Sequence, residues 1–191
     1  AFNAVRGIFV THRHGDHTNG LPEFMDLCHW HYQEAHPVIV MPDKDIADLI
    51  VRWADTADGP RDRKHCIAIA KEGEVYHDGA VRVTAGRTQH LPNSFYYLIE
   101  AEEKKLLFTG DLRHPDVDFP AVAFEKELDL LICETAHFPP SACIDSFNRS
   151  KAKRILHNHV CPWNEPHIEE IAMKHHSYEY GAAFDGMEIE L

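Results

Sequence analysis

The chain has 191 residues, of which 44% are hydrophobic and 26% charged, as in an ordinary globular domain with one substantial core. Its formal net charge of −12 argues against a broad nucleic-acid-binding surface, because such a surface needs Lys and Arg to displace counterions. No apolar run approaches the about 20 residues of a membrane span, and the first residues lack the pattern of a secretion signal.

The first third of the chain predicts strands that alternate with helices. Residues 5–11 and 37–41 are apolar runs of strand length. Between them, Asn19 is expected to cap a helix, and Asp43 is expected to cap the next one. That second helix places four apolar residues on one face: Ile46, Leu49, Ile50 and Trp53. Trp53 is expected to lie in the core.

A surface loop is predicted over 55–64, where Asp58-Gly59-Pro60 interrupts the pattern and the basic cluster Arg61, Arg63 and Lys64 follows. From 65 to 110 the pattern is rich in strands separated by turn residues. The expected strands are 66–70, 74–77, 80–85, 95–100 and 105–109.

The last third again alternates strands and helices. Strands are expected at 128–133, at 154–157 and at the end of the chain, 187–191. Asp145 is expected to cap a helix that runs to about Lys153, and Asn164 is expected to cap the last helix. With no internal repeat or linker, this order predicts one α/β domain over 1–191.

The five cysteines are odd in number and contain no Cys-x-x-Cys pair, which argues against a disulfide framework and for a reducing cytoplasm. Three of them lie in apolar stretches and are expected in the core: Cys28, Cys66 and Cys133.

One stretch carries an unusual density of metal-type ligands. Residues 11–20 read Thr-His-Arg-His-Gly-Asp-His-Thr-Asn-Gly and lie between a predicted strand and a predicted helix. The four ligands are His12, His14, Asp16 and His17. Imidazoles and a carboxylate suit zinc or a similar first-row metal.

Further polar residues follow later apolar strands, where a sheet edge can gather them. They are His90, Asp111, the pair Glu134 and His137, and the pair His157 and His159. The order of these ligands along the chain resembles that of the metallo-β-lactamase superfamily of metal-dependent hydrolases. The matching features are the His-x-His-x-Asp-His motif, the lone His90, the Asp of Thr109-Gly110-Asp111 and a late His, each after a strand.

The resemblance implies two divalent metal ions. One ion would be held by His12, His14 and His90, and the second by Asp16, His17 and His159, while Asp111 would bridge both. Zinc is the expected metal, with manganese and iron as alternatives. The family pattern of a strand, a polar residue, His and then an apolar residue fits His159 better than His157, and His157 stays the alternative.

The implied fold is an α/β, four-layer αββα sandwich. Members of the superfamily normally have several strands before the His-x-His motif, whereas only about eleven residues precede it in this sequence. We therefore expect the sandwich to be N-terminally truncated, with the single hydrolase domain partial at that end.

The details of the motif favour one branch of the family. The sequence from Thr11 to Pro22 is similar to the corresponding motif of ribonuclease Z, but that enzyme carries a tRNA-clasping arm between the third His and the bridging Asp. Here His90 and Asp111 are only 21 positions apart, which leaves no room for an arm. The bridging residue is Asp rather than the Cys of the main zinc β-lactamases, which argues against β-lactam hydrolysis. The small phosphodiesterase-like branch remains.

The expected reaction is hydrolysis of a small phosphodiester by a metal-bridging hydroxide. Asp16 would orient that hydroxide, His137 would protonate the leaving alkoxide, and Glu134 would hydrogen-bond a metal-binding His. The alternatives are a thioester or lactone hydrolase with the same metals, a ribonuclease Z-like nuclease, and a non-catalytic binding domain. The expected partner is a small-molecule substrate, without membrane or extended nucleic-acid binding, and a homodimer stays open.

Overall fold

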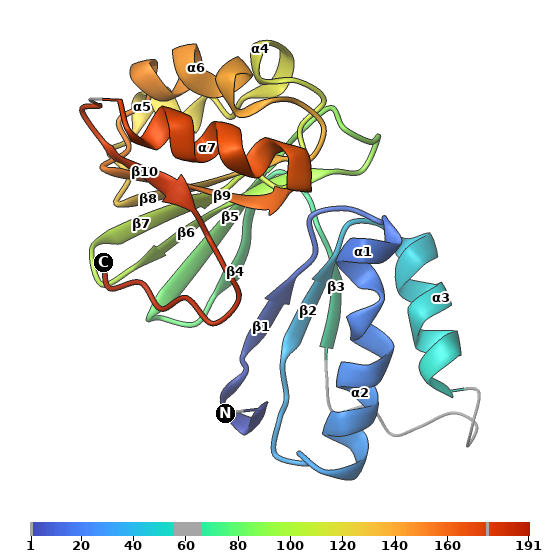
Figure 1. Ribbon diagram of the computed structural model, residues 1–191. Helices are drawn as coiled ribbons and strands as arrows, with labels where there is room; N and C mark the ends of the chain where they lie inside the picture. The colour runs from blue at the N-terminus through green and yellow to red at the C-terminus, as the bar shows by residue number, and fades with distance from the viewer. Residues whose placement is uncertain (1, 56–65, 175) are drawn as a thin grey trace. The chain divides into compact units, whose positions relative to one another are not determined.

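The computed structural model describes residues 2–55, 66–174 and 176–191, and the chain divides into two compact units, 1–71 and 72–191 (Figure 1). Almost all of the predicted surface loop at 55–64, including Arg61, Arg63 and Lys64, lies outside the described residues. None of the helices in the described parts of the chain is long and apolar enough to cross a membrane.

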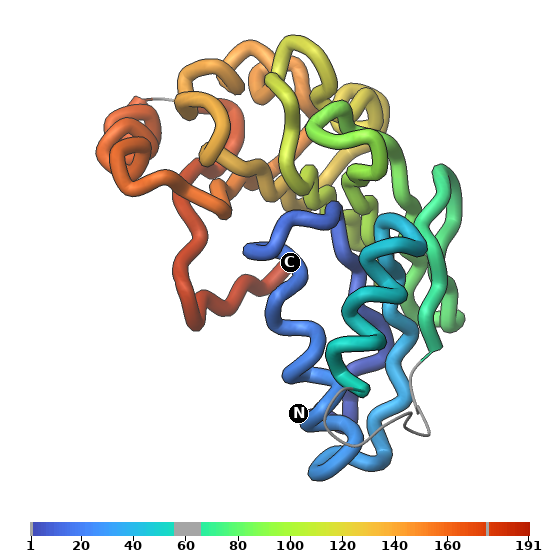
Figure 2. Tube along the Cα trace, turned by 90° about the vertical axis from the view of Figure 1, so that its right-hand side faces the viewer, coloured from blue at the N-terminus to red at the C-terminus, as the bar shows by residue number. Residues whose placement is uncertain are grey.

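The first unit is a small parallel sheet with helices packed against it. Its strands, in spatial order, are β1 (Gly7–Phe9), β2 (Val38–Met41) and β3 (Cys66–Ile69). A 3-10 turn (Phe2–Ala4) precedes them, and the helices are α1 (Gly15–Thr18), α2 (Gly20–Trp30) and α3 (Lys44–Asp55). Figures 1 and 2 show α2 and α3 side by side. The core of this unit includes Ile39 and Met41 from the sheet and Leu21 and Met25 from α2.

Helix α3 begins where the sequence predicted, but it buries a different face. The N–H of Ile46 donates to Asp43 Oδ1 at 3.0 Å, which confirms Asp43 as the cap. The buried positions are Ile46, Ala47 and Ile50, whereas Leu49 and Trp53 are each 59% exposed. The placement of Trp53 in the core was therefore wrong. The buried face is centred between Ile50 and Ala47. It lies about 60° around the helix axis from the predicted apolar face, because the helix packs through Ala47 rather than through Leu49 and Trp53.

Two other predictions in this unit were also wrong. Asn19 makes no side-chain capping bond, because α1 runs directly into α2 and leaves Asn19 with helical dihedral angles of −61° and −25°. Cys66 is exposed, because β3 is an edge strand of the sheet, whereas Cys28 is buried as predicted.

The second unit contains a seven-stranded mixed sheet in the order β10-β9-β8-β7-β6-β5-β4. Strands β4 to β7 form an antiparallel meander, and β7 to β10 are parallel neighbours. The strands are β4 (Gly73–His77), β5 (Val81–Arg87), β6 (Phe95–Ala101), β7 (Lys104–Phe108), β8 (Leu130–Thr135), β9 (Arg154–Val160) and β10 (Glu179–Ala182). The meander and the first parallel strands confirm the predicted strands from 74 to 157.

Helices cover one face of this sheet, as Figure 1 shows. They are α4 (Pro115–Asp118), α5 (Val122–Glu125), α6 (Ile144–Arg149) and α7 (Glu165–Ala172), with 3-10 turns at Pro140–Cys143 and Pro162–Asn164. The core between these layers is built from Leu107, Leu131 and Ile155 of the sheet and Phe147 of α6. Cys133 of β8 is fully buried there, as predicted.

The structure corrects three predictions near the C-terminal end. The final strand is β10 rather than 187–191, because no described strand pairs with the alternating residues after Gly186. Helix α6 begins at Ile144, so Asp145 lies in its first turn instead of capping it. Asn164 precedes α7 but does not cap it, because its side chain donates to the carbonyl oxygens of Thr135 at 2.6 Å and Phe138 at 3.3 Å.

Candidate metal centre

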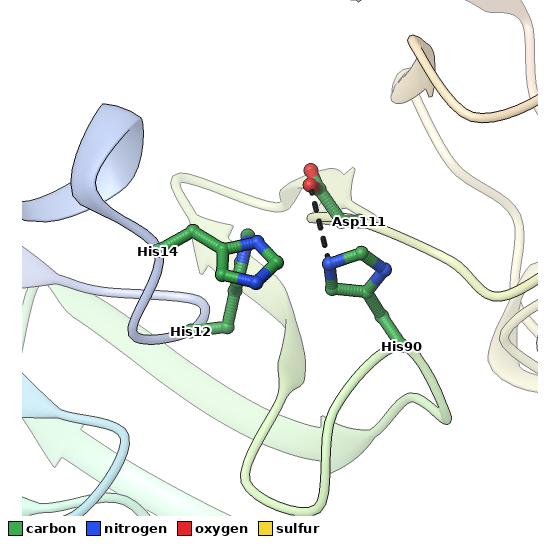
Figure 3. A group of neighbouring side chains, drawn as sticks. All are labelled: His12, His14, His90 and Asp111. Atoms are coloured by element: carbon green, nitrogen blue, oxygen red, sulfur yellow. Dashed lines mark hydrogen bonds and ion pairs between the residues drawn. The ribbon is translucent and has the colours of Figure 1, made fainter.

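In the first unit, the end of β1 and the start of α1 gather the four residues of the His-x-His-x-Asp-His motif. Nε2 of His12 lies 3.0 Å from Nδ1 of His14, and Figure 3 shows these two rings close together. The ring centroids of His12 and His17 are 4.1 Å apart, and Asp16 Oδ2 lies 3.3 Å from Nε2 of His17. The hydroxyl of Thr18 donates to the carbonyl oxygen of His14 at 3.0 Å, which ties the loop to the helix.

In the second unit, the remaining predicted ligands surround one buried carboxylate. Oδ2 of Asp111, which follows β7, lies 3.8 Å from His90 Nε2 and 3.6 Å from His159 Nε2. Figure 3 shows the ring of His90 directed at this carboxylate from the loop between β5 and β6. His137, which follows β8, brings its Nδ1 to 3.8 Å from the same oxygen. Because β7, β8 and β9 are parallel, the segments that follow them lie at one edge of the sheet.

The donor set of this cluster fits a divalent first-row metal. Ligand atoms of Asp111, His137 and His159 all lie within 4.8 Å of one another. Two imidazole nitrogens and a carboxylate oxygen are the ligand types that zinc prefers in catalytic sites. A buried carboxylate among imidazoles would also be costly without positive charge near it.

His159 reaches this edge through an irregular backbone. Its φ angle is +48°, in the left-handed region that non-glycine residues rarely adopt. The pairing of β8 with β9 shifts register between Glu134 and Thr135, beside this position. Bulges of this kind re-aim side chains and are frequent next to active sites. The conformation costs roughly 1–3 kcal/mol, so the surrounding fold must hold His159 in place.

His157, the alternative late histidine, has both ring nitrogens engaged in the interior. Nδ1 donates to the carbonyl oxygen of Cys133 at 3.0 Å, and Nε2 accepts from the hydroxyl of Tyr180 at 2.7 Å. Burial lowers the pKa of His157 to about 4, which keeps the ring neutral. His157 therefore serves the packing of β8, β9 and β10, and His159 stays the predicted ligand.

Glu134 is a buried carboxylate that organises the loop after β8. One oxygen accepts from the N–H of Leu112 at 2.7 Å, and the other accepts from the N–H groups of Ala136 at 3.0 Å and His137 at 3.1 Å. The second oxygen also lies 2.8 Å from Nδ1 of the His137 ring. Burial raises the pKa of Glu134, because desolvation disfavours the charged form. Glu134 thus orients His137, the residue expected to donate a proton.

Sequence reasoning missed one residue of this region, Asp118 at the end of α4. Its carboxylate accepts hydrogen bonds from Gln89, 29 positions earlier, and from Arg113. Nothing in the local sequence distinguishes Asp118 from the neighbouring Asp116, which is exposed. Only the meeting of two loops in the folded chain shows its importance.

Comparison with known proteins assigns most of the chain to one family. Residues 1–160 match the family model described as a beta-lactamase superfamily domain. A curated protein named ribonuclease Z from Limosilactobacillus fermentum is 31% identical over 97 residues, covering 50% of this chain and 31% of that protein. The chain thus spans about a third of the length of this relative.

Solved structures share the fold. Human tRNase Z, short form, has a TM-score of 0.73 at 20% identity, covering 100% of this chain and 80% of its own. The metallo-beta-lactamase fold protein YhfI from Bacillus subtilis has a TM-score of 0.72 at 18% identity, covering 95% of this chain and 76% of its own. These likenesses confirm the predicted fold class. The chain has the metallo-β-lactamase fold, and it belongs to the beta-lactamase superfamily.

Proposed function

We propose that the protein is a dinuclear metal-dependent hydrolase that cleaves a small phosphodiester. The observation that carries this proposal is the buried Asp111 carboxylate, with three imidazole nitrogens 3.6–3.8 Å from it. The proposed ligands are His12, His14, Asp16, His17, His90, Asp111 and His159, with Asp111 bridging the two ions. Membership of the superfamily supports this set, and the match of one family model to residues of both units supports the proposal of a single hydrolase domain.

When bound, two divalent ions would supply an activated water and positive charge for the phosphoryl oxygens. The side chains of the chain would complete the reaction. The carboxylate of Asp16, whose side chain is 59% exposed, would accept a hydrogen bond from the attacking water and set its direction. Zinc is the proposed metal because imidazole nitrogens dominate the ligand set.

His137 is the proposed general acid. Its Nδ1 lies 2.8 Å from Glu134 Oε2, so an N–H at that position donates to a carboxylate and the ring is held in one orientation. The same carboxylate would stabilise the imidazolium form, as the Asp of a catalytic triad does. His137 Nε2 would then deliver a proton to the leaving alkoxide oxygen. His137 also lies within ligand distance of Asp111 and His159, so the metal content of His137→Ala separates the two roles.

The segment between His90 and Asp111 supports a small substrate. Residues 95–108 of this segment form the hairpin of β6 and β7, a compact element without a long insertion. The net charge of −12 also disfavours extended RNA binding. A ribonuclease Z-like nuclease is the second candidate, because the curated relative at 31% identity carries that name.

The five free thiols support the expected reducing, cytoplasmic setting.

The test is a panel of substrates assayed with zinc and with manganese. It compares bis(p-nitrophenyl) phosphate, nitrocefin, a simple thioester, a lactone and precursor tRNA, with Asp111→Ala as the blank. We expect turnover of the phosphodiester, and elemental analysis should find about two metal ions per chain. Faster turnover of the thioester or lactone would assign the protein to carbonyl hydrolysis. Cleavage of precursor tRNA alone would favour the nuclease.

A further inference from the structure

Two loops of the second unit that carry proposed ligands are joined by one side chain, that of Asp118. Its Oδ2 atom accepts hydrogen bonds from the N–H groups of Gln89 at 2.6 Å and Arg113 at 3.0 Å. Its Oδ1 atom accepts from the N–H of His114 at 3.1 Å. Gln89 directly precedes His90, and Arg113 lies two residues after Asp111. A single carboxylate therefore holds both loops.

A second contact joins the same two loops near the end of β5. Thr88 Oγ1 lies 3.0 Å from the carbonyl oxygen of Asp111 and 2.7 Å from the hydroxyl oxygen of Ser94. The Ser94 hydroxyl accepts from the N–H of Leu91 at 3.0 Å, which closes the loop around His90. Thr88 and Ser94 are both buried, so water does not compete easily for these contacts.

The chemistry at Asp118 requires a carboxylate. An ionised carboxylate only accepts hydrogen bonds, and its two oxygens can satisfy all three converging N–H groups. An asparagine of the same shape offers one acceptor oxygen and turns an NH₂ group toward N–H donors. Asp118 is only 9% exposed, so backbone donors that lose this acceptor are not readily satisfied by water.

We propose that Asp118 is a positioning residue of the metal centre, assisted by Thr88. It holds the His90 loop against the Asp111 loop, at the spacing that brings His90 Nε2 to 3.8 Å from Asp111 Oδ2. This inference rests on the proposed function, since it takes both side chains as metal ligands. Partners that fix the orientation of ligands typically change metal affinity by about 10–100-fold when they are mutated.

The experiment compares Asp118→Asn with Asp116→Asn, the same substitution on the same helix at a side chain that is 77% exposed. Zinc affinity is measured by competition with a chromophoric chelator. We expect about 10–100-fold weaker binding in Asp118→Asn and wild-type affinity in Asp116→Asn. In the metal-free protein, amide hydrogen exchange at Gln89, Arg113 and His114 should become faster only in Asp118→Asn.

Wild-type zinc affinity in folded Asp118→Asn would overturn the proposal. If the wild-type protein bound neither zinc nor manganese, the proposed function would fail, while amide exchange would still test the link between the loops. Should Asp118→Asn not fold, Thr88→Val and Thr88→Ser answer the same question, because only serine keeps the hydroxyl. Weaker zinc binding in Thr88→Val than in Thr88→Ser would support the proposal, and equal binding would overturn it.

Discussion

Gly86 is the strand position at which the smallest substitution should have the clearest effect on stability. It lies in β5 opposite Tyr96 of β6, and the Tyr96 ring lies over it. A Cβ atom at Gly86 would overlap Cζ, Cε1 and Oη of this ring, well inside van der Waals contact. Tyr96 also packs against the core of the second unit, so its ring cannot move away without losing contacts.

We expect Gly86→Ala to destabilise the protein. Overpacking of this kind costs about 1–3 kcal/mol, and the reduced freedom of the unfolded chain returns about 0.4–1 kcal/mol. At the midpoints of these two ranges the net loss in the free energy of unfolding is about 1.3 kcal/mol, which lowers the Tm by roughly 3–5 °C for a chain of this size. Urea and thermal unfolding of the metal-free protein measure both quantities.

The matched control is Gly181→Ala in β10, where an added Cβ would meet Leu156 Cδ2 at an ordinary 3.8 Å. This variant should change the free energy of unfolding by less than about 0.5 kcal/mol. In a double-mutant cycle, Gly86→Ala should cost at least about 1 kcal/mol less in a Tyr96→Ala background. Unchanged stability of Gly86→Ala, or strictly additive effects in the cycle, would refute the reasoning.

Two further predictions concern the late histidines and a surface ion pair. By elemental analysis, His159→Ala should reduce the metal content from about two ions per chain to about one. His157→Ala should lower the Tm but leave the metal content of the folded protein at about two ions per chain. The opposite pattern would identify His157 as the ligand. The hydrogen bond from Lys153 Nζ to Asp129, at 2.8 Å, and that from the Lys105 N–H hold the pKa of Asp129 below its usual range. The stabilisation is present above the unfolded pKa of about 4 and is lost as the pH falls through the folded value, so Asp129→Asn should cost up to about 1 kcal/mol at pH 7 and progressively less at an acidic pH below the folded value. Equal thermal destabilisation at both pH values would contradict this.

Local sequence determined much of this protein. The apolar runs predict β1, β2 and the strands from β3 to β9, because a strand that is buried on one or both faces needs that composition wherever it occurs. The predicted ligands stand just after such runs: His12 follows β1 of the three-stranded sheet, whereas His90 and Asp111 follow β5 and β7, which run in the same direction in the seven-stranded sheet. The family resemblance could therefore be identified from the sequence without knowledge of the tertiary fold.

Tertiary packing decided which face of an element is buried and which distant residues meet. Trp53 is apolar and at helical spacing, yet it is exposed because α3 packs on its alanine side. His159 takes a left-handed conformation beside a register shift, and that register depends on how β8 and β9 pair. Asp118 and Asp116 are the same residue type two positions apart, but only Asp118 meets Gln89. Hydrogen bonds between residues far apart in the chain depend on strand register and loop path, which no local periodicity encodes.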